Sequence, residues 1–235
     1  MEHQTLKITG VLSDPTRFSI YQYVTKQHRD VTVQEIADAF EIHANVARLH
    51  LTKLEDVNML ISETKKTGKG GRPSRFYRLS DEVVSLQFPY RDYQKLSEIA
   101  IDTLLSLGSI GEKALTETGR KYGYESARTY LQALDLSLND LENKEKLNHI
   151  KTVALQQGLN PEMHYNEETH EVNFRIYNCT FKELVPDRAP ICKMHQALIH
   201  GFFDYFFGEI DLNKESFMSE GIDYSLCSYK TLVLP

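Results

Sequence analysis

The sequence predicts an α+β protein with a folded unit at each end and a helical middle region. Near the start, apolar residues at helical spacing precede two short strands that flank a glycine-rich basic stretch, Gly68 to Arg75. The middle has helical spacing, and near the end strand-like alternation surrounds one long helix. These patterns divide the chain into residues 1–85, 86–158 and 159–235.

Composition limits the class of protein. The chain has 235 residues, enough for two modest domains with real cores. It contains no apolar run of the roughly 18 residues that a membrane span needs, and its first residues do not form an apolar signal segment. Three cysteines, an odd number, argue against a disulfide framework. We therefore expect a cytoplasmic protein with reduced thiols and no membrane partner.

The charge is distributed unevenly. Residues 1–80 hold 12 Lys and Arg against 9 Asp and Glu, whereas the remaining chain holds 15 against 24. The stretch from 64 to 80 has six basic residues and no acidic one. A locally basic module in an acidic protein can still bind a polyanion if its basic side chains share a face. Charge alone fits a solvated loop equally well.

Local signals place the first elements. Asp14 and Pro15 suit the start of a helix, as N-cap and first helical residue. Thr32 is the expected N-cap of the next short helix, and Asn58 suits a left-handed helix end. The elements expected after Thr32 are helices over 33–40 and 44–58 and strands over 61–64 and 76–79.

Two helices with a tight turn, followed by a basic hairpin, predict a winged helix-turn-helix. The second helix would present polar donors to base edges in the major groove, and the wing would contact phosphates or the minor groove. His50 is expected to pack inside or to cap a hydrogen bond, and outward-facing Leu49 could meet a thymine methyl group. The candidate DNA-binding residues are His43, Asn45, Arg48, Thr52, Lys69, Arg72 and Arg75.

The middle region predicts helices over 93–107, 109–122, 124–136 and 140–157, with Gly123 ending the second. These helices suit a dimerisation scaffold, and they suit a plain helical core as well. Dimerisation has a separate argument, because one recognition helix rarely discriminates enough and regulators of this kind pair half-sites by two-fold symmetry. We expect a homodimer on a palindromic or pseudo-palindromic double-stranded operator.

The last region predicts a small α+β domain that carries every cysteine. Cys179 falls at a strand end, Cys192 near the start of a helix, and Cys227 within a later strand; His195 lies one helical turn beyond Cys192. A helix N-terminus lowers a thiol pKa and so favours the thiolate that binds metal. The expected elements are strands over 162–165, 172–177, 210–212 and 224–234 and a helix over 191–207.

Three thiols suit an iron–sulfur cluster or zinc, with a fourth ligand normally present. His195 is the first candidate for that ligand and His200 a weaker one. Free cysteines are also among the most buried residue types and often only fill space. Spacing alone leaves both interpretations open, since the chain has no Cys-x-x-Cys pair.

Three segments, Asp14 to Arg17, Val46 to Leu51 and Gly71 to Leu79, resemble the ArsR/DeoR-like winged-helix repressors. The wing segment is especially similar to the SufR-type branch, as are the residues around all three cysteines, with twelve residues between Cys179 and Cys192. The resemblance implies a [4Fe–4S] cluster on the cysteines that controls operator affinity. Some members have a further cysteine where this chain has Phe206, so the fourth ligand is open.

Two other functional hypotheses remain open. A regulator could respond to an organic effector lodged among aromatic residues of the last helix, or to zinc, with no cluster. The aromatic residues are Phe202, Phe203, Tyr205, Phe206 and Phe207. An enzyme could use Cys192 as nucleophile and His195 as base, but no third orienting residue or oxyanion motif accompanies them. We therefore expect a regulator and not an enzyme.

Overall fold

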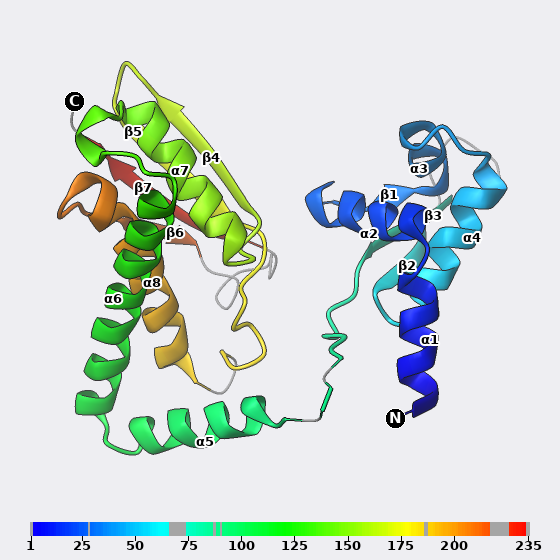
Figure 1. Cartoon of the computed structure of the whole chain (residues 1–235), viewed down its shortest axis with the longest axis horizontal. Coiled ribbons are helices and arrows are strands. Elements are labelled where there is room, and N and C mark those ends of the chain that lie inside the picture. Colours follow the sequence, from blue (N-terminus) through cyan, green and yellow to red (C-terminus); the bar gives the residue numbers. More distant parts are fainter. Residues whose placement is uncertain are drawn as a thin grey trace. The chain divides into compact units, whose positions relative to one another are not determined.

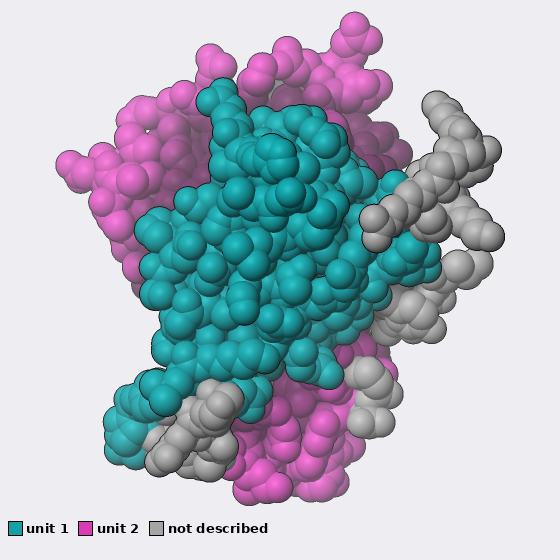
Figure 2. All heavy atoms as spheres, turned by 90° about the vertical axis from the view of Figure 1, so that its right-hand side faces the viewer, with its two compact units in different colours: residues 1–91 teal, residues 92–235 magenta. Residues whose placement is uncertain are grey.

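A computed structural model describes residues 2–27, 29–65, 74–86, 88–89, 91–185, 188–216 and 226–233. The chain forms two compact units, residues 1–91 and residues 92–235 (Figure 2). The predicted segments 86–158 and 159–235 therefore fall almost entirely within one unit. The mixed helix and sheet content confirms the α+β class (Figure 1). None of the described helices is long and apolar enough to cross a membrane.

The first unit is a winged helix-turn-helix. In chain order its elements are α1 (Glu2–Leu12), α2 (Pro15–Gln27), β1 (Val31–Thr32), α3 (Val33–Ala39), α4 (Ala44–Glu55), β2 (Leu60–Lys65) and β3 (Ser74–Leu79). The three strands form an antiparallel sheet in the order β1-β3-β2. Its core gathers apolar side chains from every helix and strand of the unit, among them Ile8, Ile20, Ile36, Leu51 and Tyr77.

Local capping chemistry accounts for these boundaries. The Asp14 carboxylate accepts the Arg17 N–H at 2.9 Å at the start of α2. The Thr32 hydroxyl accepts the Glu35 N–H at the start of α3. Helix α4 ends at Glu55, and Asn58 has the predicted positive φ, 59°. Each of these sequence predictions is confirmed, with α4 three residues shorter than expected.

The second unit packs three helices on a four-stranded antiparallel sheet. Its elements are α5 (Tyr93–Leu105), α6 (Ser109–Ala133), the 3₁₀ turn η1 (Leu138–Asp140), α7 (Asn143–Gln156), β4 (Pro161–Asn166), β5 (Glu171–Ile176), α8 (Ala189–Phe207), β6 (Asn213–Ser216) and β7 (Cys227–Leu232). The strand order is β4-β5-β7-β6. Residues of α6, α7, α8 and the sheet share one core, whereas no described residue of α5 is buried.

Helix α6 corrects one prediction. Gly123 does not end a helix: it lies inside α6, which continues to Ala133. The reason is tertiary, because a Cβ at Gly123 would collide with the Leu198 carbonyl oxygen, and a Cβ at Gly201 would collide with the Arg120 carbonyl oxygen. Paired glycines thus allow the backbones of α6 and α8 to approach closely, and Figure 1 shows the two helices side by side.

The last strands of the second unit differ in their bounds from those predicted. The strand expected over 210–212 begins instead at Asn213, and Ile210 precedes it with its carbonyl oxygen 2.6 Å from His200 Nε2. The strand expected over 224–234 is β7, and residues 217–225 and 234–235 lie outside the described part of the chain.

Candidate functional site

Helix α4 presents a polar outer face and a buried inner face. Ala47, His50, Leu51 and Leu54 are buried against the rest of the unit. The outer face carries the predicted DNA-binding residues: Asn45, Arg48 and Leu49 are exposed and Thr52 is half-buried. These residues follow the i, i+3, i+4, i+7 spacing of a single helical face. A helix with this division can enter a major groove without exposing its core.

The first turn of α4 is held by hydrogen bonds between polar side chains and the backbone. His43 is the N-cap, and its Nδ1 accepts the Asn45 N–H at 3.2 Å. Arg48 Nη1 donates to Asn45 Oδ1 at 3.1 Å, so these two side chains hold each other on the exposed face. The positive end of the helix dipole lies at the same end. A guanidinium and an amide in this position suit bidentate contacts to guanine and adenine.

Arg75 reaches the same helix from the wing strand. Its Nε donates to Ser62 Oγ at 2.7 Å, and its Nη2 contacts both Glu55 carboxylate oxygens at 2.7 and 2.8 Å. The guanidinium also lies 5.3 Å from the Tyr77 ring centroid. Arg75 therefore joins β3 to the last turn of α4, with its charge matched by a carboxylate. The other two predicted wing residues, Lys69 and Arg72, lie outside the described residues.

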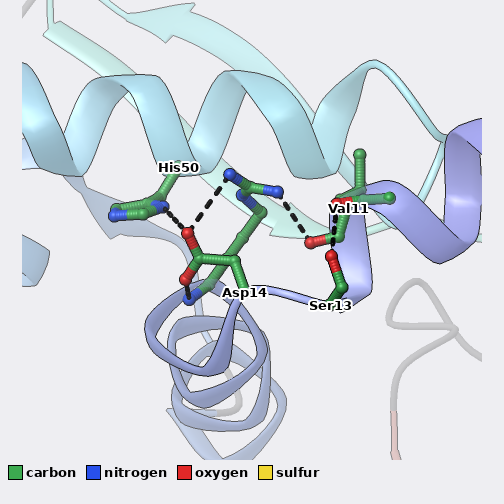
Figure 3. Close-up of polar contacts among 6 residues, drawn as sticks. Val11, Ser13, Asp14 and His50 are labelled. Carbon is green, nitrogen blue, oxygen red and sulfur yellow. Dashed lines mark hydrogen bonds and ion pairs between the residues drawn. The ribbon is translucent and has the colours of Figure 1, made fainter.

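A polar network behind α4 was not predicted as such (Figure 3). Arg17 Nη1 donates to the Val11 carbonyl oxygen at 2.7 Å, and its Nη2 lies 3.5 Å from Asp14 Oδ2. His50 Nδ1 is 4.0 Å from the same carboxylate oxygen. The Arg17 backbone N–H lowers the pKa of Asp14, and the charges of His50 and Arg17 lower it further.

This network links α4 to the two helices before it. Asp14 immediately precedes α2, Val11 lies in the last turn of α1 and His50 belongs to α4, so three helices meet around the Asp14 carboxylate and the Arg17 guanidinium. His50 packs inside, as expected. Asp14 and Pro15 marked the helix cap, but the approach of His50 depends on tertiary packing and could not be predicted from the sequence.

The second unit places the three cysteines on three different elements. Cys179 follows β5 in a turn and is buried, Cys192 is half-buried in the first turn of α8, and Cys227 is the buried first residue of β7. Cys227 pairs in register with Ile176 of β5, three residues before Cys179. The segments that carry Cys179 and Cys227 therefore lie at the same end of the sheet.

Cys179 and His195 are in direct contact. Cys179 Sγ lies 3.3 Å from His195 Nδ1, and the Phe181 ring meets the imidazole edge-on at 5.1 Å between centroids. Burial raises the pKa of Cys179 to about 11, with smaller contributions from Cys227 and Cys192. Burial lowers the pKa of His195 to about 4. At neutral pH the pair is a protonated thiol and a neutral imidazole.

These donors fit a soft metal chemically. Thiols and a neutral imidazole are the ligands that zinc and iron–sulfur clusters prefer. His195 Nε2 is buried and has no hydrogen-bond partner among the described residues, which is costly for a polar atom and indicates an unmet contact. Within the described ranges, however, no three His, Cys, Asp or Glu side chains form a group that could hold a metal ion. Ligation would therefore require local rearrangement.

Tyr229 was missed by sequence reasoning. It is buried beside Cys227, two residues apart on β7 and hence on the same face of the strand. Burial raises the pKa of Tyr229 well above its usual value, and the proximity of the ionisable thiols of Cys227, Cys192 and Cys179 adds to that effect. The two-residue spacing was the available signal. We refer to Cys179, Cys192, Cys227, His195 and Tyr229 as the thiol cluster.

Other sequence candidates take up different positions. The hydrogen-bond partner of His195 Nδ1 is Cys179, whereas the enzyme hypothesis paired His195 with Cys192. Of the aromatic residues considered for an organic effector, Phe202, Phe203 and Phe206 are fully buried core residues. Phe206, which stands where some SufR-type proteins have cysteine, stacks on His149 with centroids 6.1 Å apart.

Comparison with known proteins supports the helix-turn-helix assignment of the first unit. The family described as a helix-turn-helix domain matches residues 12–63, a span that runs from the end of α1 into β2 and includes all of α4. No curated protein sequence matches the chain. The family match and the geometry of α4 together support a winged-helix, DNA-binding transcriptional regulator.

Proposed function

We propose that this protein is a transcriptional repressor that binds a pseudo-palindromic operator as a homodimer, with operator affinity set by an iron–sulfur cluster, [4Fe–4S], in the second unit. Cys179, Cys192 and Cys227 would hold the cluster, with His195 as the fourth ligand. The direction of regulation and the cluster type rest on the resemblance to SufR-type regulators. The single observation that carries the sensor proposal is buried His195, whose Nδ1 contacts Cys179 and whose Nε2 has no hydrogen-bond partner in the described part of the chain.

The DNA-binding part is supported by the exposed face of α4. Asn45 and Arg48 would read base edges, and Thr52 lies one turn farther along the same face. His43 would keep the first turn of α4 in shape through its N-cap hydrogen bond. Arg75, together with Lys69 and Arg72 at the wing, would contribute phosphate contacts. The Asp14, Arg17 and His50 network would hold α4 in a fixed position while it does so.

The sensor part is supported by the residues that surround Cys179. A bound cluster supplies an electron- and oxygen-sensitive centre whose loss can be read out by the protein. Before loading, burial keeps Cys179 as a thiol and His195 neutral. Ligation would release the thiol protons, and His195 would then use Nε2, which no described residue contacts by a hydrogen bond.

Coupling between sensor and operator would pass through α8. Loading would fasten a turn, a helix and a strand to one another, since the three cysteines belong to three elements. Helix α8 is bound to α6 by a bidentate pair, with Arg120 Nη2 2.9 Å from Asp204 Oδ1 and Arg120 Nε also bonded to this carboxylate. A shift of α8 would thus move α6, and in the dimer it would alter the spacing of the two recognition helices.

The test of occupancy is purification without oxygen, followed by iron, acid-labile sulfide and zinc analysis. We expect iron and sulfide in equal amounts, and a brown colour that oxygen bleaches. Cys192→Ser should fold, as judged by circular dichroism, but contain much less iron; Ser228→Ala on β7 is the matched control that should keep it. A colourless protein with neither iron nor zinc would contradict the metal proposal.

A second candidate is a regulator that responds to an organic effector or to zinc. The observation that favours it is the lack, within the described part of the chain, of a ready-made group of metal-binding side chains. The same analysis separates the possibilities: zinc without sulfide indicates a zinc site, and a metal-free protein that binds its operator indicates an organic effector.

A further inference from the structure

Helix α5 is an anomaly within the second unit. It spans 13 residues, none of them buried. Its large apolar side chains are exposed as well: Tyr93, Leu96 and Ile99 leave 64%, 61% and 56% of their surface accessible to solvent. Figure 1 shows α5 leading away from the paired helices α6 and α8. A short isolated helix is marginal in water, and one that also exposes large apolar side chains usually has a partner.

The exposed apolar side chains form a continuous stripe. Tyr93, Leu96, Ala100 and Thr103 follow alternating spacings of three and four residues, which place them along one side of the helix, and all four are exposed. Ile99 lies beside them. The charged residues Lys95, Glu98 and Asp102 all lie off the stripe. The stripe thus has no charged residue that would lose water on contact with an apolar surface.

We infer that this stripe is covered by α5 of a second copy of the chain, packed antiparallel to the first. The inference rests on the homodimer of the proposed function and identifies its interface. Each chain has one recognition helix among its described residues, so a two-fold pair of chains is what reading two half-sites requires. The docking partner proposed here is therefore another copy and not an unrelated protein.

The stripe is complementary to itself in one register. An antiparallel pair centred on residue 98 sets Tyr93 opposite Thr103 and Leu96 opposite Ala100, so that each large side chain meets a small one. Alternation of large and small residues is how facing helices fill space without voids. This register follows from the order of the four residues and needs no change in α5.

The charged side of α5 is already engaged within the chain. Lys95 and Asp102 lie on the side of the helix away from the centre of the stripe, and Asp102 accepts two hydrogen bonds from Arg188. A second copy can therefore cover the apolar stripe and leave this ion pair in place.

Helix α5 contacts the start of α8, the helix that carries two residues of the thiol cluster. Asp102 accepts two hydrogen bonds from Arg188, at 2.7 and 3.1 Å, and Arg188 is the N-cap of α8, four residues before Cys192. Lys193 of α8 lies 3.4 Å from Glu112 near the start of α6. A dimer formed through α5 would therefore be linked by these ion pairs to α8, the helix that carries Cys192 and His195.

The first experiment measures the mass of the full chain by sedimentation equilibrium over a range of concentrations. We expect the unaltered chain to be a dimer. Leu96→Glu should raise the dimer dissociation constant on the order of a hundredfold, because it would bury a charge. Leu155→Glu is the matched control, since Leu155 of α7 is 59% exposed and lies outside the stripe. It should leave the mass unchanged.

A second pair of variants tests the register and guards against misfolding. Leu96→Ala alone should weaken the dimer, and adding Ala100→Leu should restore it, because each copy then sets its new leucine opposite the new alanine. A dimer that Leu96→Glu does not weaken would overturn the α5 interface and leave the homodimer standing. Failure of the double variant to recover would overturn the antiparallel register. A monomeric unaltered chain would contradict both the interface and the proposed dimer.

Discussion

The close approach of α6 and α8 predicts opposite effects for the same substitution in two helices. We consider Gly123→Ala in α6 and Gly10→Ala in α1. A Cβ at Gly123 would collide with the Leu198 carbonyl and would lie 3.2 Å from the Gly201 Cα, whereas a Cβ at Gly10 meets nothing within 4 Å. Both glycines lie in helices and neither needs a positive φ. The difference between them is therefore the opposing backbone.

The magnitude follows from two opposing terms. Replacing glycine by alanine within a helix gains about 0.8–1 kcal/mol of helix propensity. Overpacking a rigid contact costs about 1–3 kcal/mol, and the upper end applies at Gly123 because the obstructing atoms are backbone. We expect Gly123→Ala to destabilise the second unit by about 1–2 kcal/mol. Gly10→Ala should stabilise the first unit by about 0.5–1 kcal/mol.

Scanning calorimetry of the full chain, with hydrogen exchange to assign each transition, measures both effects. A change in stability of 1 kcal/mol corresponds to a shift in Tm of about 2–4 °C for the second unit (residues 92–235) and about 4–8 °C for the smaller first unit (residues 1–91). Gly123→Ala should lower the Tm of the second unit and speed amide exchange in α6 and α8, and Gly10→Ala should slow exchange in α1. If Gly123→Ala raised the Tm as Gly10→Ala does, the reasoning about the α6–α8 contact would be refuted.

Three further predictions concern the two sites. In the metal-free chain, burial of neutral His195 contributes stability that is complete above the unfolded pKa of 6.5 and is lost as the pH falls towards the folded pKa of about 4. The expected loss is roughly 3 kcal/mol, and urea unfolding of His195→Gln should not show it. Arg48→Ala should cost about 1–3 kcal/mol of operator affinity in a gel-shift titration, whereas Lys113→Ala on α6 should cost nothing. Glu55→Gln should release Arg75, tighten binding to any duplex and steepen the dependence of log K on log salt by about one; an unchanged slope would mean that Arg75 does not reach phosphate.

Local rules were enough for much of the first unit. The N-cap hydroxyl of Thr32, the positive φ of Asn58 and the alternation of buried and exposed residues in α4 depend on neighbours within a few positions. All three agree with the prediction from the sequence. The exposed positions of Asn45 and Arg48 follow from that alternation. Their hydrogen bond could not be predicted, because it depends on rotamers.

Contacts between distant segments account for what sequence reasoning missed. Gly123 reads as a helix end by composition, and only the α8 backbone explains why it lies within a helix. His195 is three residues from Cys192, but the turn after β5 brings Cys179 to its Nδ1. Arg75 was expected to face phosphate, and Glu55 at the end of α4 now holds its guanidinium. In each case the deciding partner lies far away in sequence.

The central proposal is that the state of the thiol cluster sets operator affinity. Its most direct test is the dissociation constant for the operator, measured for the unaltered chain and Cys192→Ser, each as prepared without oxygen and after oxidation in air. Allosteric couplings of about 1–3 kcal/mol correspond to changes of roughly 5- to 150-fold. We predict that oxidation weakens binding of the unaltered chain within that range and leaves Cys192→Ser unaffected. Equal affinities of the unaltered chain before and after oxidation would contradict the proposal.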